Sequence, residues 1–312
     1  CNTCWHVIST HGAIQCDNNP RVGTPDEADW WPTKTAGRRI VVVGSGIAGM
    51  EAAWVAAARG HKVTVFGSGA EAGGKARLHA LLPGGENLSS IYDFQRLSAN
   101  RFGVDMRLGK LATIDDVLAL KPDAVVLATG STPAWPEFLP AEYRGEGVFP
   151  DIRQAVAMLA DLHGRQPGTA LIYDHDQSAF TYAAAEFLLE RFEKVLLATP
   201  RERLGAVEPL VNRQGIYRRL YRKGVEVITL SDPTADSRFE EGEVTLRHIF
   251  TGAQQVVRDV ALFTYATSRA ADDAMAAPLR AAGLEVHQIG DCFAPRLPLN
   301  ATAEGHRVGN AL

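Results

Sequence analysis

The pattern of apolar and polar positions alternates between short buried strands and longer helices from residue 38 onward. RRIVVVGSGIAGMEAAWVAAARG predicts a buried strand, a glycine turn and an Ala-rich helix, and the following HKVTVF predicts a second strand. This order is typical of a βαβ unit, which takes about 30 residues. PDAVVLATG predicts another buried strand that ends in a glycine turn.

A second cycle of the same kind begins after Pro150. The predicted helices are DIRQAVAMLADLHG, AFTYAAAEFLLERF and the first part of YRRLYRKGVEVITL. The predicted strands are TALIYDHD, KVLLATP, the last part of YRRLYRKGVEVITL, EVTLRHIF, QQVVRDVALFTY and EVHQIGD. NATAEGHRVGNAL begins a final helix, inside which the chain ends, and residues 1–35 show no sustained period and are predicted to be irregular.

The two cycles are similar to each other, because residues 38–70 and 168–200 follow the same succession of strand, turn and helix. Alternating β and α elements predict the α/β class, with mainly parallel sheets covered by helices on both faces. We therefore expect two Rossmann-like nucleotide-binding domains, and 312 residues are enough for two domains.

Composition narrows the class of protein. With 46% hydrophobic and 22% charged residues, the chain is expected to be soluble and globular. A net charge of −4 gives no reason to expect a nucleic acid or an anionic membrane as partner. There is no apolar run of about 18 residues that would predict a transmembrane helix. Four cysteines are too few for a disulfide framework, and their clustering favours metal ligands in a reducing, cytoplasmic compartment.

The glycine loop GSGIAG places Gly44, Gly46 and Gly49 between a strand and a helix. The first glycine permits a tight turn, the second lets the backbone approach a diphosphate, and the third lets the helix pack on the strand. Nucleotide binding is therefore predicted, and a tight turn with nothing bound is the alternative. The acidic residue expected at the end of the second strand is replaced by Gly67, where Ser68 offers one weaker hydrogen bond.

Three further short motifs follow this loop. They are Gly73-Gly74 after the second strand, Thr129-Gly130 at the end of a later strand and Gly290-Asp291 at the end of the last strand. In this order they resemble the disulfide-reductase-like flavoproteins. That resemblance implies an FAD-type or ADP-type domain over 36–146 and 284–312, interrupted by an inserted NAD(P)-type domain over 147–283.

The corresponding turn of the second cycle, LIYDHDQSAF, has no glycine. Asp174, His175 and Asp176 stand there instead, and two carboxylates at this place repel a pyrophosphate. We therefore predict that the inserted domain does not bind NAD(P)H. An Asp-His-Asp metal site is the alternative, but we favour a solvated loop.

Three cysteines open the chain with the spacing C-x2-C-x11-C. Cys1, Cys4 and Cys16 suit zinc or an iron–sulfur cluster, either of which takes four ligands. His6 or His11 is a candidate fourth ligand for zinc. Otherwise the fourth ligand precedes residue 1, and we expect the chain to be a fragment that is cut at both ends.

The whole chain resembles the C-terminal part of the trimethylamine dehydrogenase and 2,4-dienoyl-CoA reductase group. The likeness rests on CNTC, on Cys16 followed by NNPRVGTPDEADWWP, and on the ending GDCFAPRLPLNATAEGHRVGNAL. The resemblance implies that residues 1–35 are a truncated [4Fe–4S] segment. It also implies a preceding FMN-carrying barrel that is absent from these residues, and a first cluster cysteine three residues before Cys1.

The resemblance also implies roles for single residues. Iron would be ligated by Cys1, Cys4 and Cys16. The residues implied in binding FAD or ADP are Gly44, Gly46, Gly49, Ser68, Gly74, Thr129, Gly130, Asp291, Arg296 and Ala301. Asp291 would bond a ribose or ribityl hydroxyl, and backbone N–H groups near Ala301 would face a flavin. Arg296 would neutralise a phosphate or a neighbouring carboxylate, with a surface salt bridge as the alternative.

No side chain in these 312 residues is predicted to be a catalytic acid, base or nucleophile. Cys292 is interpreted as a small buried residue and His306 as part of a helix face. We expect these residues alone not to turn over an amine.

The amine dehydrogenase branch of the group resembles this chain better than the reductase branch, because the second phosphate turn is missing. The predicted function is thus an electron-transfer portion, from FMN through [4Fe–4S] to an electron-transferring flavoprotein, with a homodimer as the candidate assembly. The alternatives are an NAD(P)H-dependent dienoyl or enoate reductase and a non-redox nucleotide-binding scaffold with zinc.

Overall fold

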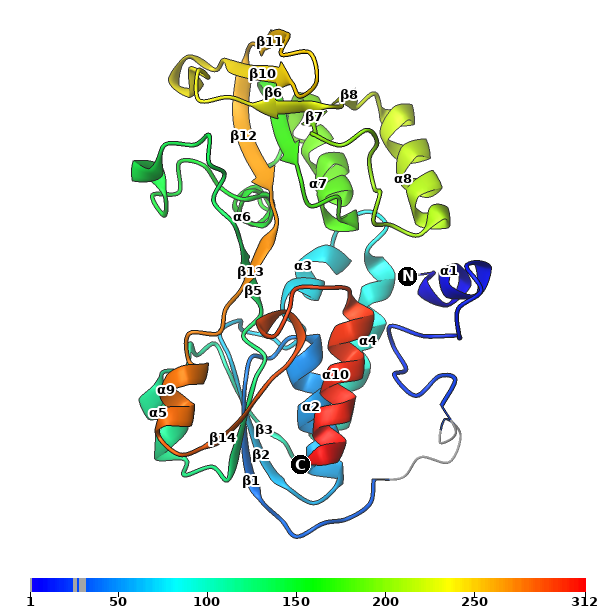
Figure 1. The fold of residues 1–312 in the computed structure, drawn as a ribbon, viewed down its shortest axis with the longest axis vertical. Helices are drawn as coiled ribbons and strands as arrows, with labels where there is room; N and C mark the ends of the chain where they lie inside the picture. Colours follow the sequence, from blue (N-terminus) through cyan, green and yellow to red (C-terminus); the bar gives the residue numbers. More distant parts are fainter. Residues whose placement is uncertain (1, 25–26, 28–31) are drawn as a thin grey trace. The chain divides into compact units, whose positions relative to one another are not determined.

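The computed structural model describes residues 2–24, 27 and 32–312 and divides the chain into two compact units (Figure 1). Unit 1 comprises Cys1–Ala80, Glu86–Thr132 and Arg269–Leu312, and unit 2 comprises Leu81–Gly85 and Pro133–Ser268. Cys1 itself lies outside the described residues. Because residues 81–85 and 133–268 belong to unit 2, the first unit is interrupted by the second.

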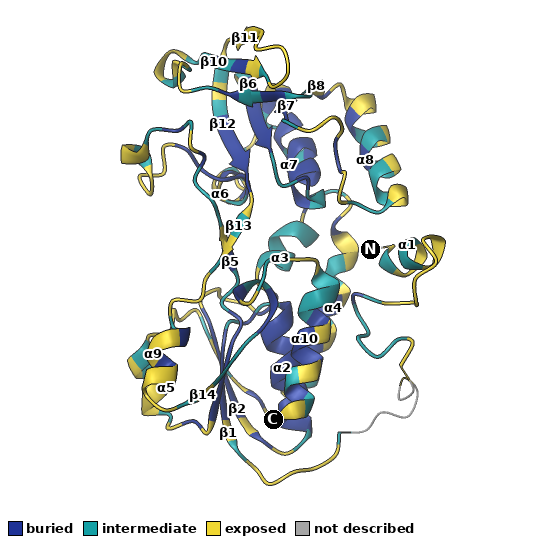
Figure 2. Cartoon of the chain, viewed as in Figure 1, coloured by how far each residue is buried: buried dark blue, intermediate teal, exposed yellow. Residues whose placement is uncertain are grey.

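The sheet of unit 1 has five parallel strands, and this confirms the predicted α/β class. Their order is β14 (Glu285–Gln288), β4 (Ala124–Leu127), β1 (Arg39–Val43), β2 (Lys62–Gly67) and β3 (Asp105–Leu108). One face packs on α2 (Ile47–Ala58), α4 (Ser89–Arg101) and α10 (Pro298–Ala311), and the other face packs on α5 (Ile114–Ala119) and α9 (Ala276–Ala281). Figure 2 shows the strands and α2 as the most deeply buried elements of this unit.

Alternate residues of β1 serve the two faces, as a strand requires. Ile40 and Val42 belong to the core under α2, and Val41 and Val43 belong to the core under α5 and α9. The register pairs Val43 with Phe66 of β2 and with Leu127 of β4, so the three strands end at one edge. This edge carries the glycine turn.

The closest helix packing in unit 1 joins α10 to α2. A Cβ at Gly305 would lie 2.4 Å from the Ala48 carbonyl oxygen, and one at Gly309 would lie 2.9 Å from the Ala52 carbonyl oxygen. Two glycines four residues apart share a helix face, so the backbone of α10 rests directly on α2. The two helices run side by side in Figure 1.

Unit 2 contains a parallel sheet and a smaller antiparallel sheet. The parallel strands, in order, are β12 (Val260–Ala266), β6 (Gln166–Asp174), β7 (Phe192–Ala198) and β8 (Glu226–Ile228), and the antiparallel strands are β11 (Gln254–Val257), β10 (Val244–His248) and β9 (Ser231–Pro233). Its helices are α6 (Ile152–Met158), α7 (Ala179–Leu189) and α8 (Leu210–Lys223). The predicted single strand QQVVRDVALFTY is in fact two, β11 and β12.

The smaller elements complete the chain. They are the paired strands β5 (Ser131–Pro133) and β13 (Arg269–Ala271), the helices α1 (Thr3–Ser9) and α3 (Lys75–Ala80), and the 3₁₀ turns η1 (Glu86–Leu88), η2 (Ala141–Tyr143), η3 (Phe239–Glu241) and η4 (Gly290–Cys292). The described helices include none that is long and apolar enough to cross a membrane.

The boundaries of unit 2 differ from the predicted inserted domain, 147–283, and packing explains the difference. Trp135, Phe138 and Tyr143 pack with Phe149 and Phe263 in the core of unit 2. At the other end, α9 packs through Ala276 and Leu279 in the core of unit 1. Residues 133–146 therefore join unit 2, and residues 269–283 join unit 1.

The prediction that residues 1–35 are irregular is wrong for α1, which forms a short helix. The segment after it is held to unit 1 at Asp17, which accepts a hydrogen bond from Thr3 Oγ1 at 2.8 Å. The Asp17 carbonyl oxygen accepts another from Thr302 Oγ1 of α10 at 2.7 Å. Asn18 Nδ2 donates to Ser90 Oγ of α4 at 3.1 Å.

Candidate nucleotide-binding site

The glycine turn between β1 and α2 depends on two glycines for its packing. Gly44 has a φ of +112°, and a Cβ there would lie 2.1 Å from the Ala128 carbonyl oxygen. A Cβ at Gly49 would lie 2.0 Å from the Gly44 carbonyl oxygen. Gly44 is therefore required by the turn, and Gly49 is required by the contact between helix and strand.

Gly46, the N-cap of α2, instead faces open space. No described atom lies within 4 Å of the position of a Gly46 Cβ, and no described side chain caps the helix. The N–H groups of a first helical turn lack partners within the helix, and with the helix dipole they favour an anion. A diphosphate therefore fits against this turn.

A second pair of glycines, Gly73 and Gly74, lies against the same turn. The Gly73 N–H donates to the Ser45 carbonyl oxygen at 2.8 Å. Gly74 has a φ of +54°, and its Cβ would lie 2.9 Å from Gly46 Cα. The structure thus brings Gly44, Gly46, Gly49 and Gly74 together at one turn, where the Cβ position of Gly46 alone among these four is open.

The end of β2 explains why no acidic residue stands at position 67. A Cβ at Gly67 would lie 2.3 Å from Ser45 Oγ and 2.9 Å from Leu108 Cδ2. Ser45 is buried, so its side chain takes the space that a longer residue at 67 would use. Ser68 is exposed, and Glu71 forms an ion pair with Arg77.

Asp291 lies in η4 and is surrounded by donors. Its Oδ2 accepts from Ser131 Oγ at 2.8 Å and from Arg269 Nη1 at 2.7 Å, and Lys75 Nζ lies 4.0 Å away. Its Oδ1 accepts from the Arg296 N–H at 3.2 Å. A carboxylate accepts about four hydrogen bonds, so these contacts leave room for about one hydroxyl.

Arg296 forms an ion pair with Glu304 of α10, a neighbouring carboxylate. Glu304 Oε2 also accepts from the Gly290 N–H at 2.8 Å, so the pair fixes η4 on α10. A Cβ at Gly290 would lie 2.7 Å from Ala48 Cβ and 3.9 Å from Ala301 Cβ. Ala301 therefore lies close to the start of α2.

Thr129 and Gly130 hold a loop of unit 1 in place. Thr129 Oγ1 donates to the Asp272 carbonyl oxygen, and the Asp272 N–H donates to the Gly130 carbonyl oxygen at 3.0 Å. Gly130 has a φ of +93°, which favours glycine. The predicted contact of this pair with a cofactor stays a prediction.

The predicted metal ligands are described only in part. Cys4 is exposed on α1 and Cys16 is partly buried. Residues 2–24, 27 and 32–312 contain no group of three or more His, Cys, Asp or Glu that could hold a metal ion. Because Cys1 lies outside these ranges, the cluster stays a prediction. His6 and His11 are not gathered with other described ligands for zinc.

Cys292 is fully buried, as interpreted from the sequence, and burial raises the pKa of its thiol. The thiol donates to the Asp272 carbonyl oxygen at 3.3 Å.

The turn after β6 in unit 2 is filled by carboxylates of the chain itself. Asp174 accepts from the Gln177 N–H at 2.9 Å, and Asp176 accepts from the Ser178 N–H at 2.9 Å. Glu208 accepts from the Ala179 N–H at 2.9 Å. These N–H groups open α7, where a dinucleotide phosphate would bind in a working turn.

The prediction of a solvated loop at this turn is wrong for Asp174, which is fully buried. Its Oδ2 accepts from Tyr182 Oη at 2.7 Å and from Gln177 Nε2 at 3.0 Å. Buried carboxylates need such donors. The partners lie three and eight residues ahead on the chain.

Because the carboxyl of Asp174 is buried, we expect the free energy of unfolding to depend on pH. Burial, with the neighbouring Asp176 carboxylate, raises the pKa of Asp174 from 3.8 to about 7. The folded state therefore binds more protons between these values. The contribution of Asp174 to the free energy of unfolding is full below pH 4 and is lost as pH rises toward 7.

We expect Asp174→Asn to remove this dependence, because an amide does not titrate. The free energy of unfolding of the variant, minus that of the wild type, should rise by up to about 4 kcal/mol between pH 4 and pH 8. Urea unfolding across this range measures the difference. A difference that does not change with pH would contradict the buried carboxylate.

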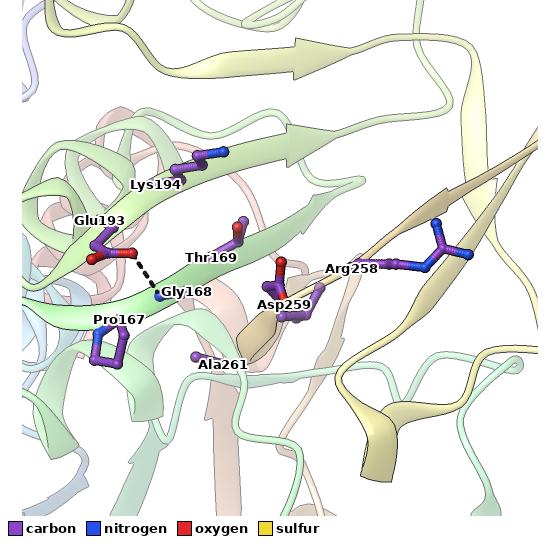
Figure 3. A pocket seen from close by; sticks show the side chains of 9 residues that line it. Pro167, Gly168, Thr169, Glu193, Lys194, Arg258, Asp259 and Ala261 are labelled. Atoms are coloured by element: carbon purple, nitrogen blue, oxygen red, sulfur yellow. Dashed lines mark hydrogen bonds between the residues drawn. The ribbon is translucent and has the colours of Figure 1, made fainter.

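A hollow of about 520 Å³ in unit 2 lies at the opposite end of the sheet from this turn (Figure 3). It is lined by Pro167, Gly168, Thr169, Glu193, Lys194, Arg258, Asp259, Val260 and Ala261. These residues belong to the amino ends of β6, β7 and β12 and to the segment before β12. Ligands of open α/β sheets bind at the carboxyl ends, so this hollow is not the nucleotide site.

A buried polar cluster around Glu51 of α2 was missed from the sequence. Glu51 Oε2 accepts from Trp54 Nε1 at 2.8 Å and from Gln95 Nε2 at 3.0 Å. His306 Nδ1 of α10 lies 3.2 Å from Glu51 Oε1, so His306 faces α2. The signal was a glutamate inside the otherwise apolar run IAGMEAAWVAAA.

Comparison with known proteins supports the nucleotide turn. Residues 38–166 match the family model of the pyridine nucleotide-disulphide oxidoreductases, which supports flavin (FAD) binding. N,N-dimethylglycine/sarcosine dehydrogenase of Chromohalobacter salexigens is 35% identical over 242 residues, which cover 75% of this chain and 33% of that protein. Dimethylamine dehydrogenase of Hyphomicrobium sp. (strain x) is 25% identical over 366 residues, which cover 100% of this chain and 47% of that protein.

Among solved structures, histamine dehydrogenase from Rhizobium sp. 4-9 shares the fold. The TM-score is 0.85 at 23% identity, and the match covers 100% of this chain and 50% of that chain. The chain thus spans between a third and a half of the length of these relatives.

Proposed function

Because this chain is related to the C-terminal part of the amine dehydrogenases and carries a pyridine nucleotide-disulphide oxidoreductase domain, we propose that it serves a flavin-dependent oxidoreductase as its nucleotide-binding and electron-transfer portion. The observation that carries the proposal is the open backbone of Gly46 at the uncapped start of α2. No described side chain there competes with a diphosphate.

In this proposal unit 1 holds FAD or ADP. The backbone N–H groups around Gly46 bind the diphosphate, and Asp291 offers its remaining acceptor position to a ribose or ribityl hydroxyl. The Arg296–Glu304 pair orients η4, and Gly290 and Ala301 keep this edge free of bulky side chains. A bound flavin supplies one- and two-electron chemistry, whereas ADP supplies none.

The finer proposal concerns the path of electrons. The portion receives electrons from an FMN domain outside these residues and delivers them to an electron-transferring flavoprotein. Cys1, Cys4 and Cys16 supply three of the four ligands that a [4Fe–4S] cluster takes. The names of the two curated relatives, both amine dehydrogenases, support an amine as the electron donor of the whole protein.

Unit 2 is proposed not to bind NAD(P)H. The three carboxylates of Asp174, Asp176 and Glu208 already accept the N–H groups that a pyrophosphate would need. A dinucleotide would have to displace all three and overcome the repulsion of those that are charged. This argues against the NAD(P)H-dependent reductase.

The test is to denature the purified protein, chromatograph the nucleotide it releases, and measure iron, acid-labile sulfide and zinc. FAD or ADP together with about four iron and four sulfide per chain is expected. A colourless protein with one zinc would favour the nucleotide-binding scaffold. Saturable NADPH binding by calorimetry would contradict the proposal for unit 2.

A further inference from the structure

The adenosine end of the proposed site lies at the carboxyl end of β2. In a dinucleotide fold an acidic residue there accepts hydrogen bonds from the ribose hydroxyls, and its charge excludes a ribose that carries a phosphate. At this place the chain has Gly67, and the nearest side chain is Ser45, whose Oγ lies 2.3 Å from the Gly67 Cβ position. A hydroxyl has thus taken the place of a carboxylate.

Two cationic side chains near this end lie on the other face of β2. Arg107 and Lys110 lie over the ring of Phe66, at 5.6 Å and 5.7 Å from its centroid. Phe66 belongs to the core under α5 and α9, whereas the Gly67 Cβ position faces the glycine turn. The two cations pair with Asp105 and Asp116 on their own side.

We propose that the adenosine end of the unit 1 site accepts adenine nucleotides with a phosphate ester on the ribose about as readily as those with free hydroxyls. This rests on the proposed function of unit 1 as an adenine nucleotide site. The Ser45 hydroxyl donates to a phosphate oxygen or accepts from a ribose hydroxyl, whereas a carboxylate only accepts. The ribose specificity of an acidic residue is therefore absent.

The experiment compares ADP with 2′-phosphoadenosine 5′-diphosphate by calorimetry, on the protein freed of endogenous nucleotide. The dissociation constants of the two probes should agree within about fivefold. In the double variant Ser45→Gly, Gly67→Glu the glycine at 45 removes both close atoms of the serine. The remaining close atom, Leu108 Cδ2 at 2.9 Å, is the end of a flexible side chain that can shift to admit the glutamate. This variant should prefer ADP by about fiftyfold or more, because the introduced carboxylate repels the 2′-phosphate of the other probe.

The matched control is Ser45→Ala, which removes the hydroxyl and adds no charge. It should weaken both probes by a similar factor, and thermal unfolding should report a folded protein. A wild-type protein that binds ADP and excludes the phosphorylated probe would overturn this inference and leave the proposed function standing. Binding of neither probe would overturn both.

Discussion

Replacing Gly46 with alanine is expected to weaken ADP binding by about tenfold to a hundredfold while the protein stays folded. The added methyl group enters space where no described atom lies within 4 Å, and this is the surface that a diphosphate must approach. Gly46 has a φ of −74°, which alanine adopts without strain. Calorimetric titration measures the binding, and urea unfolding should show a loss of about 1 kcal/mol or less.

Gly49→Ala is the matched control in the same turn. Its methyl group would lie 2.0 Å from the Gly44 carbonyl oxygen, so α2 must move away from β1. We expect this variant to lose about 3 kcal/mol or more of its free energy of unfolding. If Gly46→Ala bound ADP normally, or if it unfolded as easily as Gly49→Ala, the roles assigned to the two glycines would be contradicted.

Glu51→Ala is expected to have the second large effect, a loss of about 2–4 kcal/mol in the free energy of unfolding. The glutamate is 1% exposed and accepts hydrogen bonds from Trp54 and Gln95 inside unit 1. Its truncation leaves a cavity and removes the acceptor of these donors. The contact with His306 of α10 is lost at the same time.

Urea unfolding of Glu51→Ala should be compared with that of Glu285→Ala. Glu285 also has two side-chain partners, Arg38 and His287, but its own side chain is 46% exposed. An exposed pair contributes at most about 1 kcal/mol, so the control should unfold almost as the wild type does. Equal losses in the two variants would contradict the buried role of Glu51.

The strands and helices of the two cycles could be predicted because their patterns are local. β1, α2 and β2 lie where the apolar runs placed them, and the glycine turn between them has a known spacing. Burial that depends on distant partners could not be predicted in this way. The burial of Asp174 could not be predicted either, although Gln177 and Tyr182 lie only three and eight residues ahead, because the apolar pattern does not show that these polar side chains turn toward it.

The glycines of α10 show the same limit. The spacing of Gly305 and Gly309 is evident from the sequence. What requires these two glycines is the close contact of α10 with α2, which lies about 250 residues earlier in the chain. The boundaries of unit 2 depend likewise on where Trp135 and Phe138 find partners, among residues as far along the chain as Tyr265. The assignment of Cys1, Cys4 and Cys16 as metal ligands stays a prediction, because Cys1 lies outside the described residues.

The interruption of unit 1 by unit 2 has a consequence for synthesis on the ribosome. Translation delivers β1 and α2 before unit 2, whereas β14 and α10 emerge only after the whole of unit 2. Unit 2 can fold as soon as it is complete, because domains fold as units. Until Arg269–Leu312 emerges, unit 1 lacks β14 at the edge of its sheet and α10 against α2. Its proposed nucleotide site therefore matures only after α10 has left the ribosome.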